Sequence, residues 1–253
     1  MSLWLDVILP VVQTLVGFLL GVAAGRWRWF WRLIAQRPDV QIHVEADPEI
    51  IYANAPNWIT FPQFVPIPGS NLPPPRPGSA LGMTAWAAAL GGVPAYKQDL
   101  QVTLMAWADQ DVVVDTLRVK ATEHVLPTGV VAISPVGGAD WETKRLRVDL
   151  STFASTVTPI EAGGQEAEPF SFTLKAGERA RFHLLVQPSR TMPESVDAYA
   201  WTATLDLLVG NKRRSVTVDN RGKPFILANR NRRPEMWWSG TEWKTQADFS
   251  APS

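Results

Sequence analysis

The sequence contains no cysteine. This absence excludes disulfide bonds, thiol nucleophiles and thiolate metal sites, and it is compatible with a reducing compartment. The chain also lacks a charge excess, because it has 24 basic and 24 acidic residues among its 253. A general nucleic-acid binder carries a basic surplus, so we expect no nucleic-acid partner.

The common sequence motifs of catalytic and cofactor sites are missing as well. The chain has no G-x-S-x-G elbow, no G-x-x-x-x-G-K-[ST] loop and no G-x-G-x-x-G fingerprint. Its three histidines, His43, His124 and His183, form no HxH, HExxH or HxxxH pair. We therefore predict a protein that is not an enzyme, with no catalytic residue, no metal site and no cofactor.

Two weaker arrangements of polar residues remain as alternatives. His43, Glu45 and Asp47 alternate along one strand pattern, with Glu49 close behind, and together they offer nitrogen and oxygen ligands to a metal. A solvated outer face is the simpler interpretation of this group. His183 is expected to point outward from its strand, where a serine or an aspartate from elsewhere in the fold can approach it.

The longest apolar run lies at the start of the chain. Residues 3–24, LWLDVILPVVQTLVGFLLGVAA, would form a helix of about 33 Å, which is enough to cross a hydrocarbon core of about 30 Å. No positive charge precedes the run and arginines follow it, the reverse of the order in a cleaved signal peptide. We predict an uncleaved transmembrane helix; a buried core helix is the alternative.

Arginine and tryptophan alternate directly after this run, in RWRWFWR. Both side chains favour the membrane–water interface, which predicts an interfacial collar. Its members are Arg26, Trp27, Arg28, Trp29, Trp31 and Arg32. A membrane-active or lipid-binding segment is the alternative. Because arginines follow the helix and none precedes it, the positive-inside rule places the N-terminus outside and residues 38–253 in the cytoplasm.

A stripe of glycines runs along the predicted membrane helix. Gly17, Gly21 and Gly25 are four residues apart, so they share one helix face. Small residues at this spacing let two membrane helices approach closely, which predicts a homo-oligomer contact. The general abundance of glycine in membrane helices is the alternative explanation.

The rest of the chain alternates apolar and polar residues with a period of two, which is typical of half-buried strands. The pattern recurs at residues 39–47, 100–107, 116–121, 145–150, 170–174, 180–186, 199–209 and 215–219. GNKRR, before the last of these, predicts a hairpin turn. We therefore predict a mainly β protein: an antiparallel immunoglobulin-like β-sandwich preceded by one N-terminal transmembrane α-helix.

Four segments follow from these patterns: the membrane helix and collar (1–37), a first strand with a proline-rich connection (38–99), the sandwich body (100–228) and an Arg/Trp tail (229–253). Residues 61–79 are expected to form a loop of polyproline II character, and 83–92 a short helix. PPPRP, within that loop, is a conceivable ligand for a partner. Trp237, Trp238 and Trp243 of the tail are predicted to pack on the sandwich, with bilayer contact as the alternative. The basic runs 212–214 and 229–233 are either a charged hairpin tip and tail or sites for anions and anionic lipid.

The segments LRVKATEH, GVVAISPVGG, RLRVDL, FSFTL and WTATLDLLVGNKRRSVTVDNRGKPF occur in this order. Together they resemble an uncharacterised group of actinobacterial membrane-tethered β-sandwich proteins. The resemblance covers about residues 100–227 and is most specific at DNRGKPF. It implies the fold but no activity, and some members of the group carry the domain outside the membrane.

Three functional hypotheses follow. The first is a single-pass membrane protein that presents the sandwich as a binding or scaffold module to an unknown protein partner. The second is an oligomerising membrane effector or envelope component, in which the sandwich is a sensor or regulatory domain. The third is an enzyme whose site is assembled only in three dimensions.

Overall fold

The structure is a computed structural model that describes residues 40–52, 62–75, 82–107, 111–133, 145–160, 170–189, 196–229 and 233–250. The predicted membrane helix, the collar from Arg26 to Arg32 and the glycine stripe lie outside these residues. Within the described part of the chain, no helix is long and apolar enough to cross a membrane.

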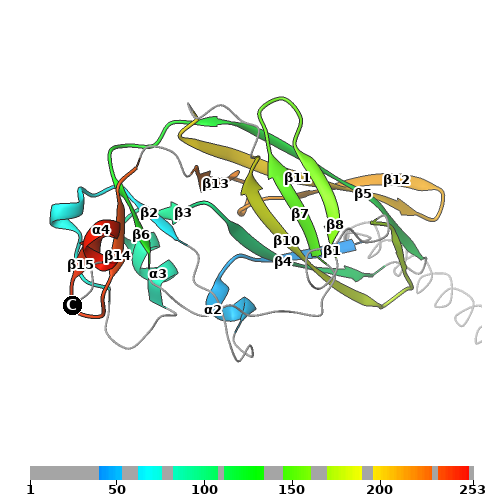
Figure 1. The fold of residues 1–253 in the computed structure, drawn as a ribbon. Coiled ribbons are helices and arrows are strands. Elements are labelled where there is room, and N and C mark those ends of the chain that lie inside the picture. The colour runs from blue at the N-terminus through cyan, green and yellow to red at the C-terminus, as the bar shows by residue number, and fades with distance from the viewer. Residues whose placement is uncertain are drawn as a thin grey trace, which may run out of the picture. The chain divides into compact units, whose positions relative to one another are not determined.

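Strands dominate the described residues and form three sheets (Figure 1). The first sheet has the order β1 (Val40–Glu45), β4 (Gln98–Ala106), β10 (Arg179–Pro188), β7 (Arg145–Leu150) and β8 (Thr156–Ile160). The second has the order β12 (Lys212–Val218), β11 (Ala198–Val209), β5 (Val112–His124) and β9 (Phe172–Leu174), and β13 (Phe225–Ala228) also pairs with β11. The third has the order β15 (Trp243–Thr245), β14 (Glu235–Trp238), β6 (Val130–Ile133), β2 (Gln63–Val65) and β3 (Val93–Pro94).

The prediction of a mainly β protein is confirmed, but the strands are not all antiparallel. β10 runs parallel to β7, and β14 runs parallel to β6. After β7 and β8 the chain enters the second sheet as β9. It then returns to the first sheet as β10, which lies beside β7 and runs in the same direction as β7. Periodicity within a strand carries no information on this direction, so the sequence patterns did not reveal it.

The first two sheets share one hydrophobic core. Leu104, Leu146 and Leu184 of the first sheet and Trp201 and Leu205 of the second belong to a single buried cluster. Burying each such side chain stabilises the fold by about 1.5–3 kcal/mol. Alternate residues of β4, β10 and β11 enter this cluster, as their period-two patterns predicted.

The hairpin from β11 to β12 forms where GNKRR predicted it. Val209 pairs with Lys212, so Gly210 and Asn211 make the turn. Gly210 has φ +56°, a conformation that glycine adopts without strain at the first position of a type II′ turn. On the other side of β11, a bulge leaves Asp115 of β5 unpaired between Val114 and Thr116.

The third sheet was not predicted. The expected proline-rich loop contains β2 and the 3-10 turn η1 (Gly69–Asn71), and the expected tail contains β14, β15 and the helix α4 (Gln246–Ser250). These strands have two to four residues, too few to show a periodic pattern. In Figure 1 the third sheet, α3 (Gly82–Ala89) and α4 gather at the left, away from the tip of the β11–β12 hairpin.

Each face of the third sheet has its own apolar cluster. On one face Met83 and Ala87 of α3 pack with Val65 and Val130, in the place where a short helix was expected. On the other face Phe64 and Val131 pack with residues of β11 and β13, which joins the third sheet to the second. The third sheet is therefore packed on both of its faces and adjoins the second sheet, where an extended proline-rich connection was expected.

Candidate functional site

Tryptophan side chains meet on the β14–β15 hairpin of the third sheet. Trp238 and Trp243 are directly paired across the two strands, and their ring centroids are 5.2 Å apart at an interplanar angle of 59°. Trp243 also stacks on Trp86 of α3, with centroids 5.6 Å apart at 27°. All three side chains are half-buried, so they present aromatic surface to solvent while they pack on the fold.

The turn of this hairpin is held by Ser239. Its backbone N–H and its hydroxyl both donate to the Glu242 carbonyl, and its hydroxyl accepts a hydrogen bond from the Glu242 N–H. Gly240 within the turn has φ +100°, which only glycine adopts readily. This local network fixes the two strands and hence the relative position of Trp238 and Trp243.

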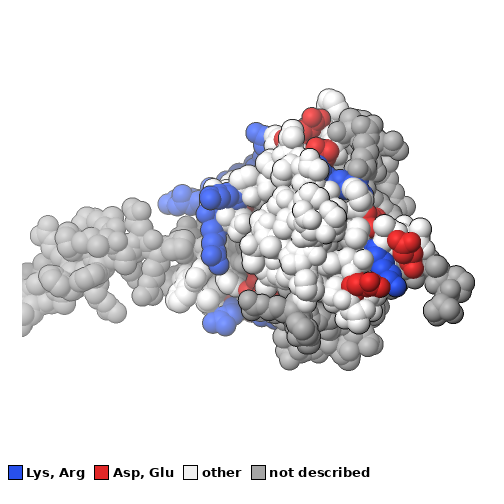
Figure 2. All heavy atoms as spheres, turned by 90° about the vertical axis from the view of Figure 1, so that its left-hand side faces the viewer, with Lys and Arg blue, Asp and Glu red and all other residues white. Residues whose placement is uncertain are grey.

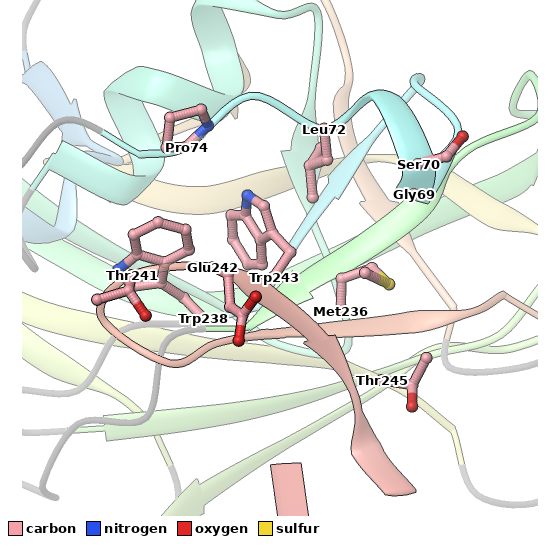
Figure 3. Close-up of a pocket in the computed structure, with 10 residues that line it drawn as sticks. All are labelled: Gly69, Ser70, Leu72, Pro74, Met236, Trp238, Thr241, Glu242, Trp243 and Thr245. Carbon is pink, nitrogen blue, oxygen red and sulfur yellow. The ribbon is translucent and has the colours of Figure 1, made fainter. Parts of the chain in front are cut away.

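The proline-rich segment forms the opposite wall. The Trp243 indole N–H donates a hydrogen bond of 2.9 Å to the carbonyl of Pro73, across a sequence separation of 170 residues. In Figure 3 the nitrogen of this indole points toward the stretch of chain that carries Leu72 and Pro74. A local sequence pattern cannot reveal this contact, because Pro73 and Trp243 lie far apart in the sequence.

Between the hairpin and this wall lies an open cleft of about 570 Å³ (Figure 3). We call it the tryptophan cleft, and its lining is Gly69, Ser70, Leu72, Pro74, Met236, Trp238, Thr241, Glu242, Trp243 and Thr245. Its volume lies within the usual range of ligand sites, about 300–1,000 Å³, and its lining is mainly apolar with a few polar groups, as in most such sites. The tail tryptophans stood out in the sequence and were expected to pack on the sandwich. Trp237 packs against the cluster that includes Ala198 of β11 and Ala228 of β13, whereas Trp238 and Trp243 lie on the third sheet beside α3.

Charge is sparse around this end of the molecule. Figure 2 faces the end that carries the third sheet and shows a central region without Lys, Arg, Asp or Glu, with basic side chains at its left margin and both acidic and basic side chains at its right. Within the cleft Glu242 is 65 % exposed and pairs with Lys244 at 3.2 Å. A pair this exposed contributes little to stability, at most about 1 kcal/mol, so the carboxylate is available to a ligand.

A second group of polar side chains lies on the outer face of the first sheet, opposite the core. His183, which is 2 % exposed, has its Nδ1 atom 3.4 Å from Asp99 Oδ1 and its Nε2 atom 3.3 Å from Gln101 Nε2. The Tyr52 hydroxyl donates to Asp99 Oδ2. If the Gln101 amide donates to Nε2, the imidazole carries its proton on Nδ1, facing the carboxylate.

This cluster, Tyr52, Asp99, Gln101 and His183, is closed off from solvent. None of the four is more than 9 % exposed, and Tyr52 follows the helix α2 (Pro48–Ile51), which packs against β4. Burial and, after it, the Asp99 carboxylate raise the pKa of Tyr52 well above its usual value, while Arg145 acts in the opposite direction. An aspartate therefore does approach His183, within a network that is buried from solvent.

The remaining candidates from the sequence are placed as follows. The His43 side chain is 70 % exposed, and its Nε2 atom lies 4.0 Å from Glu45 Oε2. The other carboxylate oxygen of Glu45 accepts hydrogen bonds from the backbone N–H groups of Ala46 and Asp47. Across the described ranges no group of His, Asp and Glu is arranged to hold a metal ion. Glu49 has no described side chain, and His124 ends β5 half-buried.

The two basic runs differ in their surroundings. Lys212, Arg213 and Arg214 are exposed at the hairpin tip. Arg233 is held inside the fold: its guanidinium donates to the carbonyls of Pro127 and Leu126 and lies 4.7 Å over the Phe64 ring. Arg233 thus fixes the start of β14 instead of facing lipid, while residues 230–232 lie outside the described part.

Comparison with known proteins assigns no family: no family model matches this chain, and no curated protein matches it.

Proposed function

We propose that this chain is a single-pass membrane-anchored interaction protein, in which an immunoglobulin-like β-sandwich presents the tryptophan cleft to a protein partner. The observation that carries the proposal is the cleft itself, which exposes the paired rings of Trp238 and Trp243 beside a proline-containing wall. Tryptophan is enriched at binding hot spots because it contributes a large apolar area at low entropic cost.

The membrane part of the proposal rests on the sequence. Residues 3–24 are long and apolar enough to span a bilayer, and Arg26, Arg28 and Arg32 follow them. In this orientation the N-terminus is outside and the folded body faces the cytoplasm. A partner would then be a cytoplasmic protein or the cytoplasmic segment of another membrane protein.

The chemistry of the cleft supports binding rather than catalysis. Among its ten lining residues, Glu242 is the one acidic or basic side chain. General acid–base or nucleophilic catalysis needs a second positioned group within hydrogen-bond reach. Neither histidine that lies near a carboxylate lines the cleft: His183, 3.4 Å from Asp99, is buried in the first sheet, and His43, 4.0 Å from Glu45, lies on β1.

A second candidate function is favoured by the glycine stripe of the predicted membrane helix. Gly17, Gly21 and Gly25 would bring two copies together in the bilayer. The protein would then be an oligomeric membrane effector or envelope component whose sandwich senses or regulates. The cleft serves this candidate equally well, because a regulatory domain also needs a ligand.

Site-specific photo-crosslinking tests the main proposal. A photoreactive benzoylphenylalanine replaces Thr241 at the cleft, or Phe153, which is 90 % exposed in the β7–β8 turn, in cells that produce the full chain. We expect a discrete protein adduct from position 241 and none from position 153. Adding Trp238→Ala to the first chain should abolish the adduct. Equal adducts from both positions, or an adduct that is insensitive to Trp238→Ala, would refute the cleft as the partner surface.

A further inference from the structure

We propose that the tryptophan cleft recognises a proline-rich segment in the polyproline II conformation that carries a basic residue. This inference rests on the proposed function, since it names the kind of partner that the cleft takes. Three features of the cleft lead to it: a proline carbonyl already bound to one indole, the geometry of the tryptophan pair, and an exposed carboxylate.

The chain's own proline-rich segment shows how such a ligand binds. Pro68, before η1, has φ −58° and ψ 144°, which is close to polyproline II, and Leu72, directly before Pro73, has φ −70° and ψ 116°, which is extended. Backbone carbonyls in polyproline II make no internal hydrogen bonds and are free to accept one. The Pro73 carbonyl does so from the Trp243 indole at 2.9 Å. One edge of the cleft therefore already makes the contact that aromatic grooves use to bind proline-rich peptides.

The second tryptophan offers the same chemistry to a ligand from outside. Trp238 lies 5.2 Å from Trp243 with its ring tilted by 59°, so the two indoles form an angled aromatic surface. In the part of the chain that the structure describes, no group accepts a hydrogen bond from the Trp238 indole N–H. A proline ring can stack on this surface while a ligand carbonyl accepts from Trp238, as Pro73 accepts from Trp243.

Glu242 supplies the preference for a basic residue. Its carboxylate lines the cleft, is 65 % exposed and forms a surface ion pair with Lys244. Such a pair is readily exchanged, because exposed ion pairs are weak. An arginine of the ligand can replace Lys244 and bind the carboxylate through two parallel hydrogen bonds. Aromatic surfaces also bind sugars, so an oligosaccharide is the competing ligand class that the experiment must separate.

Fluorescence anisotropy of a labelled PPPRPPP peptide tests the inference on the full chain in detergent micelles. We expect saturable binding that Trp238→Ala weakens by about tenfold or more. Trp107→Ala is the matched control and should leave the binding unchanged, because Trp107 directly follows β4 of the first sheet, is 48 % exposed and does not line the cleft. Glu242→Gln should weaken PPPRPPP by about threefold and leave PPPPPPP unaffected. The peptide AAARAAA should not bind.

The outcomes are separable from those of the crosslinking experiment. No saturable binding of PPPRPPP by a folded chain overturns this inference, and an intact adduct at position 241 would still uphold the cleft as a partner surface. Binding of chitohexaose that Trp238→Ala abolishes, without binding of the peptide, also overturns it. Peptide binding that survives both Trp238→Ala and Thr241→Arg would overturn it as well, because the peptide would then sit elsewhere. Circular dichroism shows whether each variant is folded. If Trp238→Ala unfolds the hairpin, Thr241→Arg replaces it in the test, because Thr241 is exposed at the rim of the cleft and its arginine would block the peptide.

Discussion

The three tyrosines of the chain experience three different environments, and replacing each by phenylalanine gives three different results. The Tyr52 hydroxyl donates to the buried carboxylate of Asp99, and the two residues are 7 % and 3 % exposed. The Tyr96 hydroxyl donates to Glu235 at 2.8 Å in a partly buried setting. The Tyr199 hydroxyl is buried and has no hydrogen-bond partner among the described residues.

The expected free energies of unfolding follow from these contacts. Tyr52→Phe leaves a buried carboxylate without one of its donors, so it should destabilise the protein by about 2 kcal/mol. Tyr96→Phe should cost about 0.5–1 kcal/mol, because water can replace the lost donor. Tyr199→Phe removes a hydroxyl that is already desolvated and unbonded, so its effect should lie between zero and a gain of about 1 kcal/mol.

Thermal and urea unfolding of the full chain in detergent, followed by circular dichroism, measure this series. For a body of this size, 2 kcal/mol corresponds to a decrease in Tm of about 4–8 °C. Because the pKa of Tyr52 is raised above its usual 10.0, unfolded chains lose this proton first as the pH rises above 10.0. The difference between wild type and Tyr52→Phe should therefore narrow above that pH. A Tyr199→Phe variant that is destabilised as much as Tyr52→Phe would refute the assignment of these hydroxyl contacts.

Three further predictions concern other parts of the chain. Asp206 accepts hydrogen bonds from Arg118, Ser215 and Thr116, and these contacts, that of Arg118 most of all, lower its pKa to about 2. Asp206→Asn should therefore cost at most about 1 kcal/mol of stability at neutral pH, since Arg118 is 66 % exposed. The resulting difference in Tm between wild type and Asp206→Asn should shrink as the pH falls from about 4 toward 2. In Gly129→Ala the new Cβ would clash with the Val65 carbonyl oxygen, so the third sheet must shift. We expect the variant to lose about 2–3 kcal/mol of stability in urea unfolding, and an unchanged midpoint would contradict the β2–β6 register. Gly21→Leu should abolish a cross-linked dimer in detergent if the glycine stripe joins two copies, whereas a dimer of unchanged yield would exclude that interface.

The period-two pattern predicted the central strands because the alternation of buried and exposed residues along one strand is visible in the local sequence. Leu205 and Leu207 alternate with polar residues along β11, and the buried faces of β4 and β10 follow the same rule. The same rule placed His183 on the outer face of β10. Its approach to Asp99 depends on the pairing of β10 with β4, which no periodic pattern encodes.

The candidate site was less accessible to sequence reasoning. Trp238 and Trp243 were recognised as unusual, but their packing partner Trp86 lies in a short helix and Pro73 in a segment expected to be a loop. Strands of three or four residues are specified by long-range pairing and burial rather than by local propensity. A cleft built from such strands becomes visible only when the chain is folded.

Membrane anchorage is the claim from which both the location of the protein and the nature of its partner follow. Alkaline carbonate extraction of membranes from cells that produce the full chain tests it directly. We predict that the intact chain stays in the membrane pellet and is released only by detergent, because the proposed helix of residues 3–24 would span the bilayer. Release of the intact chain by carbonate alone, or a mature N-terminus beyond Arg37, would contradict the account.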